Sequence, residues 1–322
     1  MRSSVTPLRV GLLGLGTVGY GVYRKLQQQS ERFSVIAIAI RDLNKHKHHA
    51  PAHLLTTSCE AAVRDADIIV ELIGGLEPAG TIVARALAEG IPVITANKHM
   101  LADSVLSKRL VCENLYFSAA IGGEVPMLET VRSCTHRGTV RRIEGVLNGT
   151  TNFILDQIAE GLSFRDALSE AQQRGFAEAD PSLDLDGSDA ACKLKLLVHQ
   201  AFDVDLPLTD IERQGLLGLD EEWVRHTARS GRRVRLVAEA ERCGAQIAAR
   251  VALKTVDCAD VFACIRNEEN ALRIQGDFAT VTLTGKGAGR WPTTVSVMSD
   301  LWEVERFIAS QTRARMALGG AA

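Results

Sequence analysis

The apolar positions of the first hundred residues form short continuous runs, and helical patterns separate them. A run at Leu8–Leu13 leads into a helical pattern at 18–29 and a second run at 33–40. The alternation continues with a run, a helix and another run, at 66–73, 81–89 and 92–95. Continuous apolar runs that alternate with helices predict a parallel sheet covered on both faces. The first part of the chain is therefore expected to be an α/β domain.

The pattern changes in the second half of the chain. A strand at 140–147 and a turn at 148–151 are followed by predicted helices at 152–159, 165–175 and 190–202. Alternation of apolar and polar positions predicts antiparallel strands at 234–241, 246–253 and 278–283. A glycine-rich loop at 284–292 then leads into a helix from 293 to about 310, whose first turn suits Pro292. These elements predict a second, α+β domain and a last helix that returns to the first domain.

Composition narrows the class of protein. The 322 residues are 46% hydrophobic and 24% charged, as expected of an ordinary globular chain. A net charge of −2 gives no basic field for nucleic acid, and no stretch approaches the ~20 apolar residues of a membrane span. The seven cysteines contain no CxxC pair, which is typical of reduced thiols. We expect a cytoplasmic protein without nucleic-acid or membrane partners.

The turn after the first strand carries the glycine pattern of a dinucleotide-binding fold. Gly14, Gly16 and Gly19 stand in the sequence GLGTVG. In that fold the three glycines permit a tight turn, an approach of the backbone to a diphosphate, and close packing of the helix. N–H groups around Thr17 and Val18 would hold the diphosphate. A chance glycine-rich turn is the alternative.

This pattern sets the expected domain borders. A Rossmann domain is predicted over residues 1–130, completed by the helix at 290–314. The second domain is expected at 131–289, and the tail at 315–322 is expected to be frayed.

The residues after the second strand bear on the choice of cofactor. A basic side chain there accommodates the 2′-phosphate of NADP, and an acidic one binds the ribose hydroxyls of NAD. Arg41 comes first, and Asp42 and a basic cluster at 45–47 follow it. The order favours NADP and leaves NAD possible, with a solvated basic loop as the alternative.

Glycines and polar residues also stand where later strands of the sheet end. They are Gly74, Gly75, Thr95 and Lys98. The carboxyl ends of parallel strands line the cofactor crevice, so these residues are expected at the cofactor. An isolated Lys98 would otherwise be a plain surface charge. Gly287 and Gly289 of the second glycine-rich loop would join the crevice if the last helix packs on the first domain; a simple turn into the helix is the alternative.

An acidic run at 175–193 is the strongest candidate for chemistry. Five carboxylates and then one lysine lie close together in it: Glu178, Asp180, Asp184, Asp186, Asp189 and Lys193. Asp189 and Lys193 are four apart in a predicted helix and so share one face. Such a group could hold a cationic amino acid and move a proton beside it. The alternative is an acidic surface loop in which Ser188 caps the helix.

Six motifs in order make the chain, from about Leu8 to Phe307, resemble the homoserine dehydrogenase family. They are GLGTVG at 14–19, ELIGG at 71–75, TANK at 95–98, EGVLNGTTNFIL at 144–155, GFAEADPSLDLDGSDAACK at 175–193 and GKGAGRWPT at 285–293. The resemblance implies an NAD(P)-dependent oxidoreductase that interconverts L-homoserine and L-aspartate 4-semialdehyde in threonine and methionine biosynthesis. It also implies a homodimer formed by the second domain.

The resemblance implies roles for individual residues as well. Substrate binding falls to Glu178, Asp184, Asp189, Gly149 and Thr150. The catalytic residues would be Lys193, Lys98 and Asp189. Nearby carboxylates favour the charged form of an amine, so the two lysines could divide proton transfer and polarisation of the reacting oxygen.

Three residues depart from the family's pattern. Ser118 stands where a glutamate commonly helps to hold a monovalent cation, so a metal site would rest on backbone carbonyls alone and is doubtful. Those carbonyls belong to Ile121, Gly123 and Val125. Glu124 replaces a small residue, and Phe176 replaces a common tyrosine.

These departures keep two alternatives open. One is a related dehydrogenase that acts on another amino or hydroxy acid. The other is a cofactor-binding sensor without turnover. The chain also stops soon after its last helix, so a short form without the regulatory ACT domain of many relatives is expected.

Overall fold

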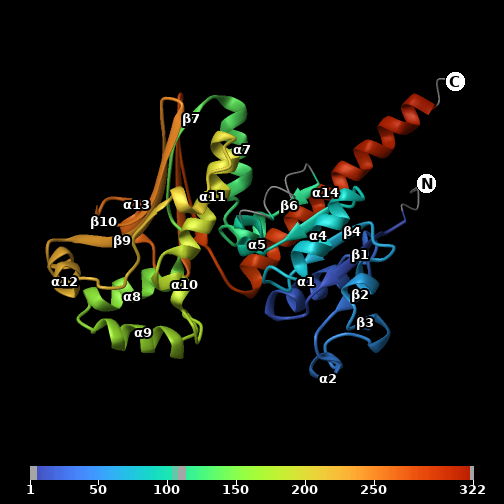
Figure 1. Ribbon diagram of the computed structural model, residues 1–322, viewed down its shortest axis with the longest axis horizontal. Coiled ribbons are helices and arrows are strands. Elements are labelled where there is room, and N and C mark those ends of the chain that lie inside the picture. Colours follow the sequence, from blue (N-terminus) through green and yellow to red (C-terminus); the bar gives the residue numbers. More distant parts are fainter. Residues whose placement is uncertain (1–5, 104–105, 107–113, 320–322) are drawn as a thin grey trace. The chain divides into compact units, whose positions relative to one another are not determined.

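The computed structural model describes residues 6–103, 106 and 114–319, with side chains as far as residue 311. The chain divides into two compact units (Figure 1). Unit 1 comprises Met1–Ala120 and Thr293–Ala322, and unit 2 comprises Ile121–Pro292. The first border therefore lies earlier than the predicted one at 130. The reason is the helix α7 (Met127–Arg137), which the sequence pattern did not predict and which packs against α11 (Ser188–Phe202) of unit 2.

Unit 1 contains the predicted parallel sheet. Its described strands lie in the order β3-β2-β1-β4-β5-β6, and every neighbouring pair is parallel. The strands are β1 (Leu8–Leu13), β2 (Phe33–Ala39), β3 (Leu55–Thr56), β4 (Ile68–Glu71), β5 (Val93–Thr95) and β6 (Leu115–Tyr116). The helices are α1 (Thr17–Gln28), α2 (Leu43–His46), α3 (Cys59–Val63), α4 (Ala79–Ala88), α5 (Lys98–Ala102) and, from Thr293 onwards, α14 (Arg290–Gly319). This is the predicted α/β dinucleotide-binding architecture.

The last helix, α14, completes the core of unit 1. Its Val297, Leu301 and Val304 are fully buried and share one hydrophobic cluster with β1, β2 and α1. Their spacing of four and three residues puts them on one helix face. The predicted return of this helix to the dinucleotide-binding domain is confirmed. The helix continues to Gly319, so the tail predicted to fray from residue 315 is helical that far.

Unit 2 is built on a mixed sheet whose described strands lie in the order β12-β11-β7-β9-β10-β8. The strands are β7 (Val140–Val146), β8 (Glu212–Arg213), β9 (Arg232–Cys243), β10 (Gln246–Asp257), β11 (Glu269–Gly276) and β12 (Thr280–Lys286). The helices besides α7 and α11 are α8 (Gly149–Ala159), α9 (Phe164–Gln173), α10 (Ser182–Leu185), α12 (Glu221–Arg229) and α13 (Val261–Cys264). The pairs within β12-β11-β7-β9-β10 are antiparallel, and β8 pairs with β10 in parallel.

Two local predictions in unit 2 are wrong. The turn expected at 148–151 is the start of α8, because Asn148 caps that helix by accepting the Thr151 N–H. Ser188 is not the cap of α11: Gly187, with a left-handed φ of 81°, precedes the helix. The Ser188 hydroxyl instead donates to the Asp186 carboxylate at 2.9 Å.

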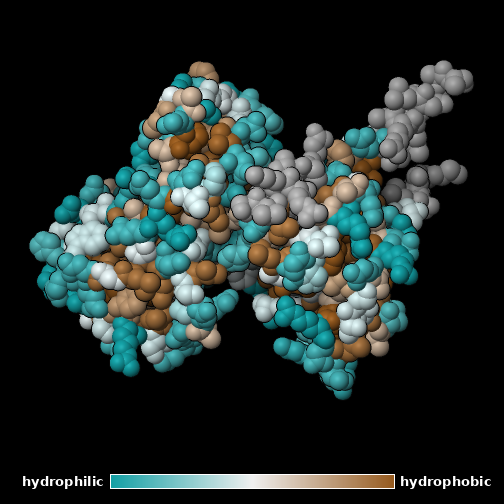
Figure 2. Space-filling model, viewed as in Figure 1, coloured by the Kyte–Doolittle hydropathy of each residue, from teal (hydrophilic) through white to brown (hydrophobic). Residues whose placement is uncertain are grey.

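Hydrophilic and hydrophobic residues are interspersed on the face of each unit seen in Figure 2. In the described part of the chain, no helix is both long enough and apolar enough to cross a membrane.

Candidate active site

The glycine turn between β1 and α1 has close approaches that only glycine permits. Gly14 has a left-handed φ of 99°, and a Cβ there would lie 2.7 Å from the Leu72 carbonyl oxygen. A Cβ at Gly19 would lie 2.2 Å from the carbonyl oxygen of Gly14. Gly16 differs, because no described atom outside its chain neighbours lies within 4 Å of a Cβ built there. The turn is tight at two glycines and open at the one where a diphosphate would approach.

The N-terminus of α1 can also receive a diphosphate. Gly16 is the N-cap of the helix, and no side-chain cap bonds its first turn within the described residues. The N–H groups at Thr17 and Val18 belong to that first turn, where helices bind anions. The chain's own residues therefore fit the diphosphate of a dinucleotide.

Arg41 and Asp42 differ in their surroundings. Arg41 is exposed just after β2. The Asp42 carboxylate caps α2 by accepting the N–H groups of Asn44 at 2.9 Å and Lys45 at 3.4 Å. The acidic group is thus engaged in helix capping, whereas the guanidinium faces solvent.

The residues predicted at the carboxyl ends of β4 and β5 lie close together. Gly74 and Gly75 both adopt left-handed backbone, with φ of 70° and 77°. The Thr95 hydroxyl donates to Glu71 Oε2 at 2.5 Å and accepts the Asn97 N–H at 3.0 Å, so it is bonded within the protein. Lys98 is the first residue of α5 and is half-buried.

In unit 2, hydrogen bonds join Asp184, Asp189 and Lys193 into one polar cluster. Lys193 Nζ lies 2.8 Å from Asp189 Oδ2 and donates to the Leu147 carbonyl oxygen at 2.6 Å. Asn148 Nδ2 donates to Asp184 Oδ1 at 2.7 Å and to Asp189 Oδ2 at 2.9 Å. Asp189 and Lys193 are 2% and 8% exposed, whereas Asp184 is half-buried. A buried ion pair beside a more accessible carboxylate can bind an ammonium group and move a proton.

The first two residues of α8, Gly149 and Thr150, also lie at the polar cluster. Thr150 Oγ1 lies 2.9 Å from Asp184 Oδ2 and 2.7 Å from the Phe176 carbonyl oxygen, so its hydroxyl can donate to either. A Cβ at Gly149 would lie 2.8 Å from Glu268 Cα, so the glycine lets α8 begin close to the loop before β11.

Glu178 lies apart from this hydrogen-bonded cluster, because its side chain is exposed to solvent. The other two acidic residues of the run bond to the backbone of local turns. Asp180 accepts the Ser182 N–H at 3.2 Å, and Asp186 accepts the Ser188 N–H at 2.8 Å. Of the five carboxylates of the run, Asp184 and Asp189 therefore belong to the cluster, Asp180 and Asp186 bond to the backbone, and Glu178 is exposed.

Asn148 and Asn270 are polar residues of the site that sequence reasoning missed. An asparagine directly before a helix is a common N-cap, so the capping role had a sequence signal. The bonds of Asn148 to the two carboxylates span 36 and 41 residues and had none. Asn270 Nδ2 donates to the Leu147 carbonyl oxygen at 3.3 Å, the same oxygen that accepts from Lys193.

The second glycine-rich loop lies against this part of the site. A Cβ at Gly287 would lie 2.0 Å from Asn270 Nδ2, and the Gly287 N–H donates to the Glu268 carbonyl oxygen at 2.8 Å. Gly289 has a left-handed φ of 112°. The loop is therefore held beside Asn270 by contacts that no larger residue at 287 would allow.

The carbonyls predicted for a monovalent cation belong to the segment before α7, at Ile121, Gly123 and Val125. The Val125 carbonyl oxygen accepts the Met127 N–H at 2.7 Å. The carboxylate of Glu124 accepts the Lys286 N–H at 3.1 Å. Because Ser118 is uncharged and the Glu124 carboxylate is bonded to β12, these residues do not fit a cation site that needs a carboxylate ligand.

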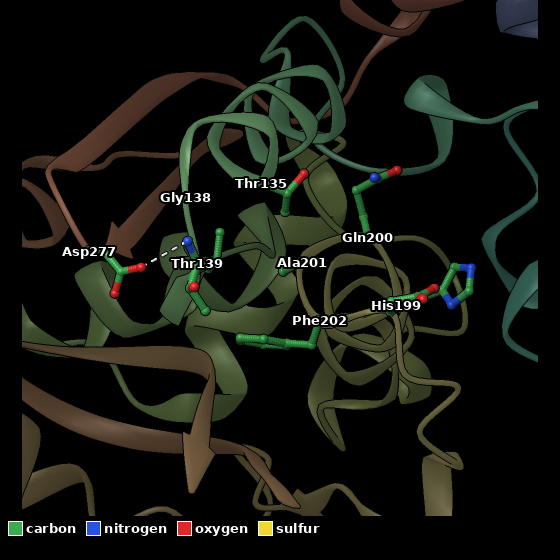
Figure 3. A pocket seen from close by; sticks show the side chains of 10 residues that line it. Thr135, Gly138, Thr139, His199, Gln200, Ala201, Phe202 and Asp277 are labelled. Carbon is green, nitrogen blue, oxygen red and sulfur yellow. Dashed lines mark hydrogen bonds between the residues drawn. The ribbon is translucent and has the colours of Figure 1, made fainter. Parts of the chain in front are cut away.

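A separate pocket of about 590 Å³ lies where α7 and α11 end (Figure 3). Thr135, Thr139, His199, Phe202 and Asp277 are among the residues that line it. Asp277 accepts the Thr139 N–H at 3.0 Å and the Arg141 Nε–H at 2.7 Å, so its carboxylate ties the turn between β11 and β12 to the start of β7. None of the lining residues belongs to the polar cluster, and the pocket is not the predicted substrate site.

A dinucleotide-binding unit joined to a second unit with a buried carboxylate–lysine cluster defines a class of protein. The class is that of nicotinamide-dependent dehydrogenases that act on a small polar substrate.

Comparison with known proteins narrows this class. The family model for homoserine dehydrogenase matches residues 126–302, and that for the homoserine dehydrogenase NAD-binding domain matches residues 14–114. Homoserine dehydrogenase of Bacillus subtilis is 34% identical over 313 residues, which cover 91% of this chain and 72% of the relative. A crystal structure of a homoserine dehydrogenase from Thiobacillus denitrificans has a TM-score of 0.89 at 35% identity and covers 94% of this chain and 74% of that one.

A hyperthermophilic archaeal homoserine dehydrogenase in complex with NADPH has a TM-score of 0.78 at 25% identity, covering 92% of this chain and 97% of that chain. The chain belongs to the homoserine dehydrogenase family, whose members are NAD(P)-dependent oxidoreductases that act on a CH–OH group of an amino acid.

Proposed function

We propose that this chain interconverts L-homoserine and L-aspartate 4-semialdehyde with NADP, in the biosynthesis of threonine and methionine. The observation that carries the proposal is the pairing of Lys193 with Asp189, which Asn148 connects to Asp184. Homoserine bears an ammonium group for carboxylates and a hydroxyl for a proton acceptor, and this cluster offers both kinds of partner.

In this proposal the carboxylates bind the substrate. Asp184, half-buried and held by Asn148 and Thr150, takes the substrate's ammonium group together with the exposed Glu178. Asp189 is buried against Lys193 and keeps the lysine oriented. The backbone at Gly149 and the hydroxyl of Thr150 complete the contact at the start of α8.

Lys193 and Lys98 divide proton transfer and polarisation of the reacting oxygen in this mechanism. The ion pair with Asp189 favours the ammonium form of Lys193, which suits donation of a proton to the aldehyde oxygen in the direction of reduction. Lys98, the first residue of α5, is assigned the polarisation of the reacting oxygen in this proposal. Alanine at either position should lower kcat about 100-fold or more, as expected when an acid–base group is lost.

When bound, the nicotinamide cofactor accepts or supplies the hydride. The open backbone at Gly16 and the first turn of α1 would hold its diphosphate, and Gly74, Gly75 and Thr95 would border its nicotinamide half. Exposure of Arg41 and engagement of Asp42 as a helix cap support NADP over NAD. Gly287 and Gly289 of the second glycine-rich loop are also proposed to contact the cofactor.

We also propose a cytoplasmic homodimer formed through the sheet of unit 2. One face of that sheet carries a cluster of opposite charges: Arg142, Glu144, Glu239, Arg250 and Lys254. Interspersed positive and negative groups on one patch can be self-complementary about a two-fold axis. Sedimentation equilibrium of the purified chain checks this proposal: a monomer at micromolar concentration would contradict it.

The test of the reaction is reduction of NADP and NAD by the purified chain with L-homoserine, L-serine, L-threonine and simple hydroxy acids. Turnover of L-homoserine, faster with NADP than with NAD, is the expected result. Turnover of another substrate with no turnover of L-homoserine would favour a related dehydrogenase that acts on another amino or hydroxy acid. Binding of the cofactor with no turnover of any substrate would favour a sensor.

A further inference from the structure

Glu71, in the ELIGG motif at 71–75, is a buried carboxylate that the proposed mechanism does not use. It is the last residue of β4 and is 0% exposed. Its Oε1 accepts the N–H groups of Ile73 at 2.9 Å and Gly74 at 3.1 Å, and its Oε2 accepts from the Thr95 hydroxyl at 2.5 Å. These three partners are neutral, so directed hydrogen bonds stabilise this carboxylate.

A closed ring of hydrogen bonds links the ends of β4 and β5 through Glu71. Glu71 and Thr95 lie opposite each other in the register of the two strands. Thr95 Oγ1 accepts the Asn97 N–H at 3.0 Å, and Asn97 Nδ2 donates to the Gly75 carbonyl oxygen at 2.6 Å. Because Gly75 follows Gly74, whose N–H donates to Glu71, the ring is complete.

The ring also fixes the start of α5. Asn97 is the N-cap of this helix, and its Oδ1 accepts the Met100 N–H at 3.2 Å. Lys98 is the residue that follows the cap. Movement of Asn97 would therefore shift the first turn of α5 and with it the backbone of Lys98.

The directions of these bonds fit an ionised Glu71. Backbone N–H groups can only donate, and Thr95 Oγ1 already accepts from Asn97, so its own proton is directed to the carboxylate. Burial raises the pKa of the Glu71 carboxyl, and the hydrogen bonds from Thr95, Gly74 and Ile73 oppose that rise. Among the described residues, no basic side chain is paired with Glu71. A buried charge without a cationic partner costs folding free energy, so stability alone does not account for this carboxylate.

The place of the ring in the sheet suggests its use. The strand order runs β1-β2-β3 on one side and β4-β5-β6 on the other, so the topological switch point lies between β1 and β4. Ligands of open parallel sheets bind outside the carboxyl ends of the strands at that point. Glu71 lies beside Leu13 in register, and the GLGTVG turn begins at the next residue, Gly14.

We propose that Glu71 is a positioning residue of the cofactor site, whose carboxylate holds the Gly74–Gly75 turn and, through Thr95 and Asn97, the first turn of α5. Glycines in left-handed backbone bring no side chain to restrain the turn, so the turn needs an anchor from elsewhere. The role rests on the proposed function in one respect, since it requires a nicotinamide cofactor at this edge of the sheet.

The test compares Glu71→Gln with Asp67→Asn by fluorescence titration of NADPH without substrate. Glu71→Gln keeps the size of the side chain and removes its charge. Asp67 precedes the same strand at its other end, where it pairs with Arg9, so its variant is a matched control. We expect Glu71→Gln to weaken NADPH binding about 10-fold, the equivalent of one charge-assisted hydrogen bond. The control should bind NADPH as the wild type does.

Steady-state kinetics separate positioning from a general loss of structure. In Glu71→Gln the KM for the cofactor should rise about 10-fold, while the KM for L-homoserine stays within about 2-fold. NADPH binding equal to the wild type, or equal weakening by Asp67→Asn, would overturn the proposal. If Glu71→Gln weakens NADPH binding but the wild type does not turn over L-homoserine, L-homoserine is excluded as the substrate. The positioning role of Glu71 is then retained.

A second pair of variants covers failure of Glu71→Gln to fold. Thr95→Val removes the hydroxyl that donates to Glu71, and Thr95→Ser retains it. We expect Thr95→Val to weaken NADPH binding about 10-fold, and Thr95→Ser to bind NADPH within about 3-fold of the wild type. Equal NADPH binding by the two variants would overturn the role of the ring.

Discussion

Replacement of Asn148 by serine should separate its two tasks in the candidate active site. Asn148 Oδ1 accepts the Thr151 N–H at 2.9 Å as the N-cap of α8, and a serine hydroxyl can take over that bond. Asn148 Nδ2 donates to Asp184 and Asp189 at 2.7 Å and 2.9 Å, and serine has no amide to replace those bonds. Asn148→Ala removes both tasks.

The expected cost follows from the burial of the two carboxylates. Asp189 is 2% exposed, so water cannot readily replace its lost donor, whereas half-buried Asp184 can bind water and keeps Thr150. The free energy of unfolding should therefore fall by about one charge-assisted hydrogen bond, 1.5–3 kcal/mol. That change lowers the melting temperature by about 3–12 °C in a unit of this size. Alanine should cost about 1 kcal/mol more, through the lost cap.

Calorimetry and steady-state kinetics on both variants provide the assay. Since both lose the amide, kcat/KM for L-homoserine should fall about 10-fold or more in each, although only alanine loses the cap. A serine variant with the melting temperature and kcat/KM of the wild type would refute the role of Asn148 as the link between the carboxylates. Alanine as stable as serine would refute the capping argument alone.

Three further predictions concern other parts of the chain. Gly16→Ala should weaken NADPH binding without lowering the melting temperature, because its methyl group occupies open space in the protein. Gly19→Ala should lower the melting temperature, because its methyl group clashes with the Gly14 carbonyl. Calorimetry and a binding titration on both variants check these results. Arg41→Ala should weaken NADPH more than NADH in parallel titrations, and equal weakening would remove the argument for NADP. The pKa of Glu239 is lowered to about 2 by hydrogen bonds and charges of its basic partners, which outweigh its burial, so its contribution to stability is present above about pH 4.5 and is lost as the pH falls towards 2. The acid-induced loss of stability should therefore be smaller in Glu239→Gln than in the wild type, as measured by urea unfolding across that pH range.

The sequence was sufficient for unit 1 wherever the signal is local. The strands β1, β2, β4 and β5 are continuous apolar runs, so their positions could be predicted. The motif GLGTVG is typical of the turn after the first strand of a dinucleotide-binding fold, so that turn could be predicted as well. The strands β3 and β6 were missed because two residues each are too few to form a pattern.

Unit 2 shows where periodicity fails. The strand β11 was missed because Ala271 and Leu272 are consecutive and both buried, which breaks the alternation expected of a strand with one solvated face. In the candidate site, the spacing of Asp189 and Lys193 predicted that they share one helix face, and there they form an ion pair at 2.8 Å. The bridging role of Asn148 depends on contacts between segments that are distant in the sequence, so no local pattern predicted it.

The proposed mechanism assigns the proton transfer to Lys193. A comparison of kcat for L-homoserine oxidation in Lys193→Met and Lys195→Met tests this assignment. Lys195 is also buried on α11, at 3% exposure, and pairs with Asp205 at 3.2 Å, outside the polar cluster. We predict that kcat falls about 100-fold or more in Lys193→Met and stays within about 3-fold of the wild type in Lys195→Met. A near-normal kcat in Lys193→Met, or an equal fall in both variants, would contradict the role of Lys193 in proton transfer.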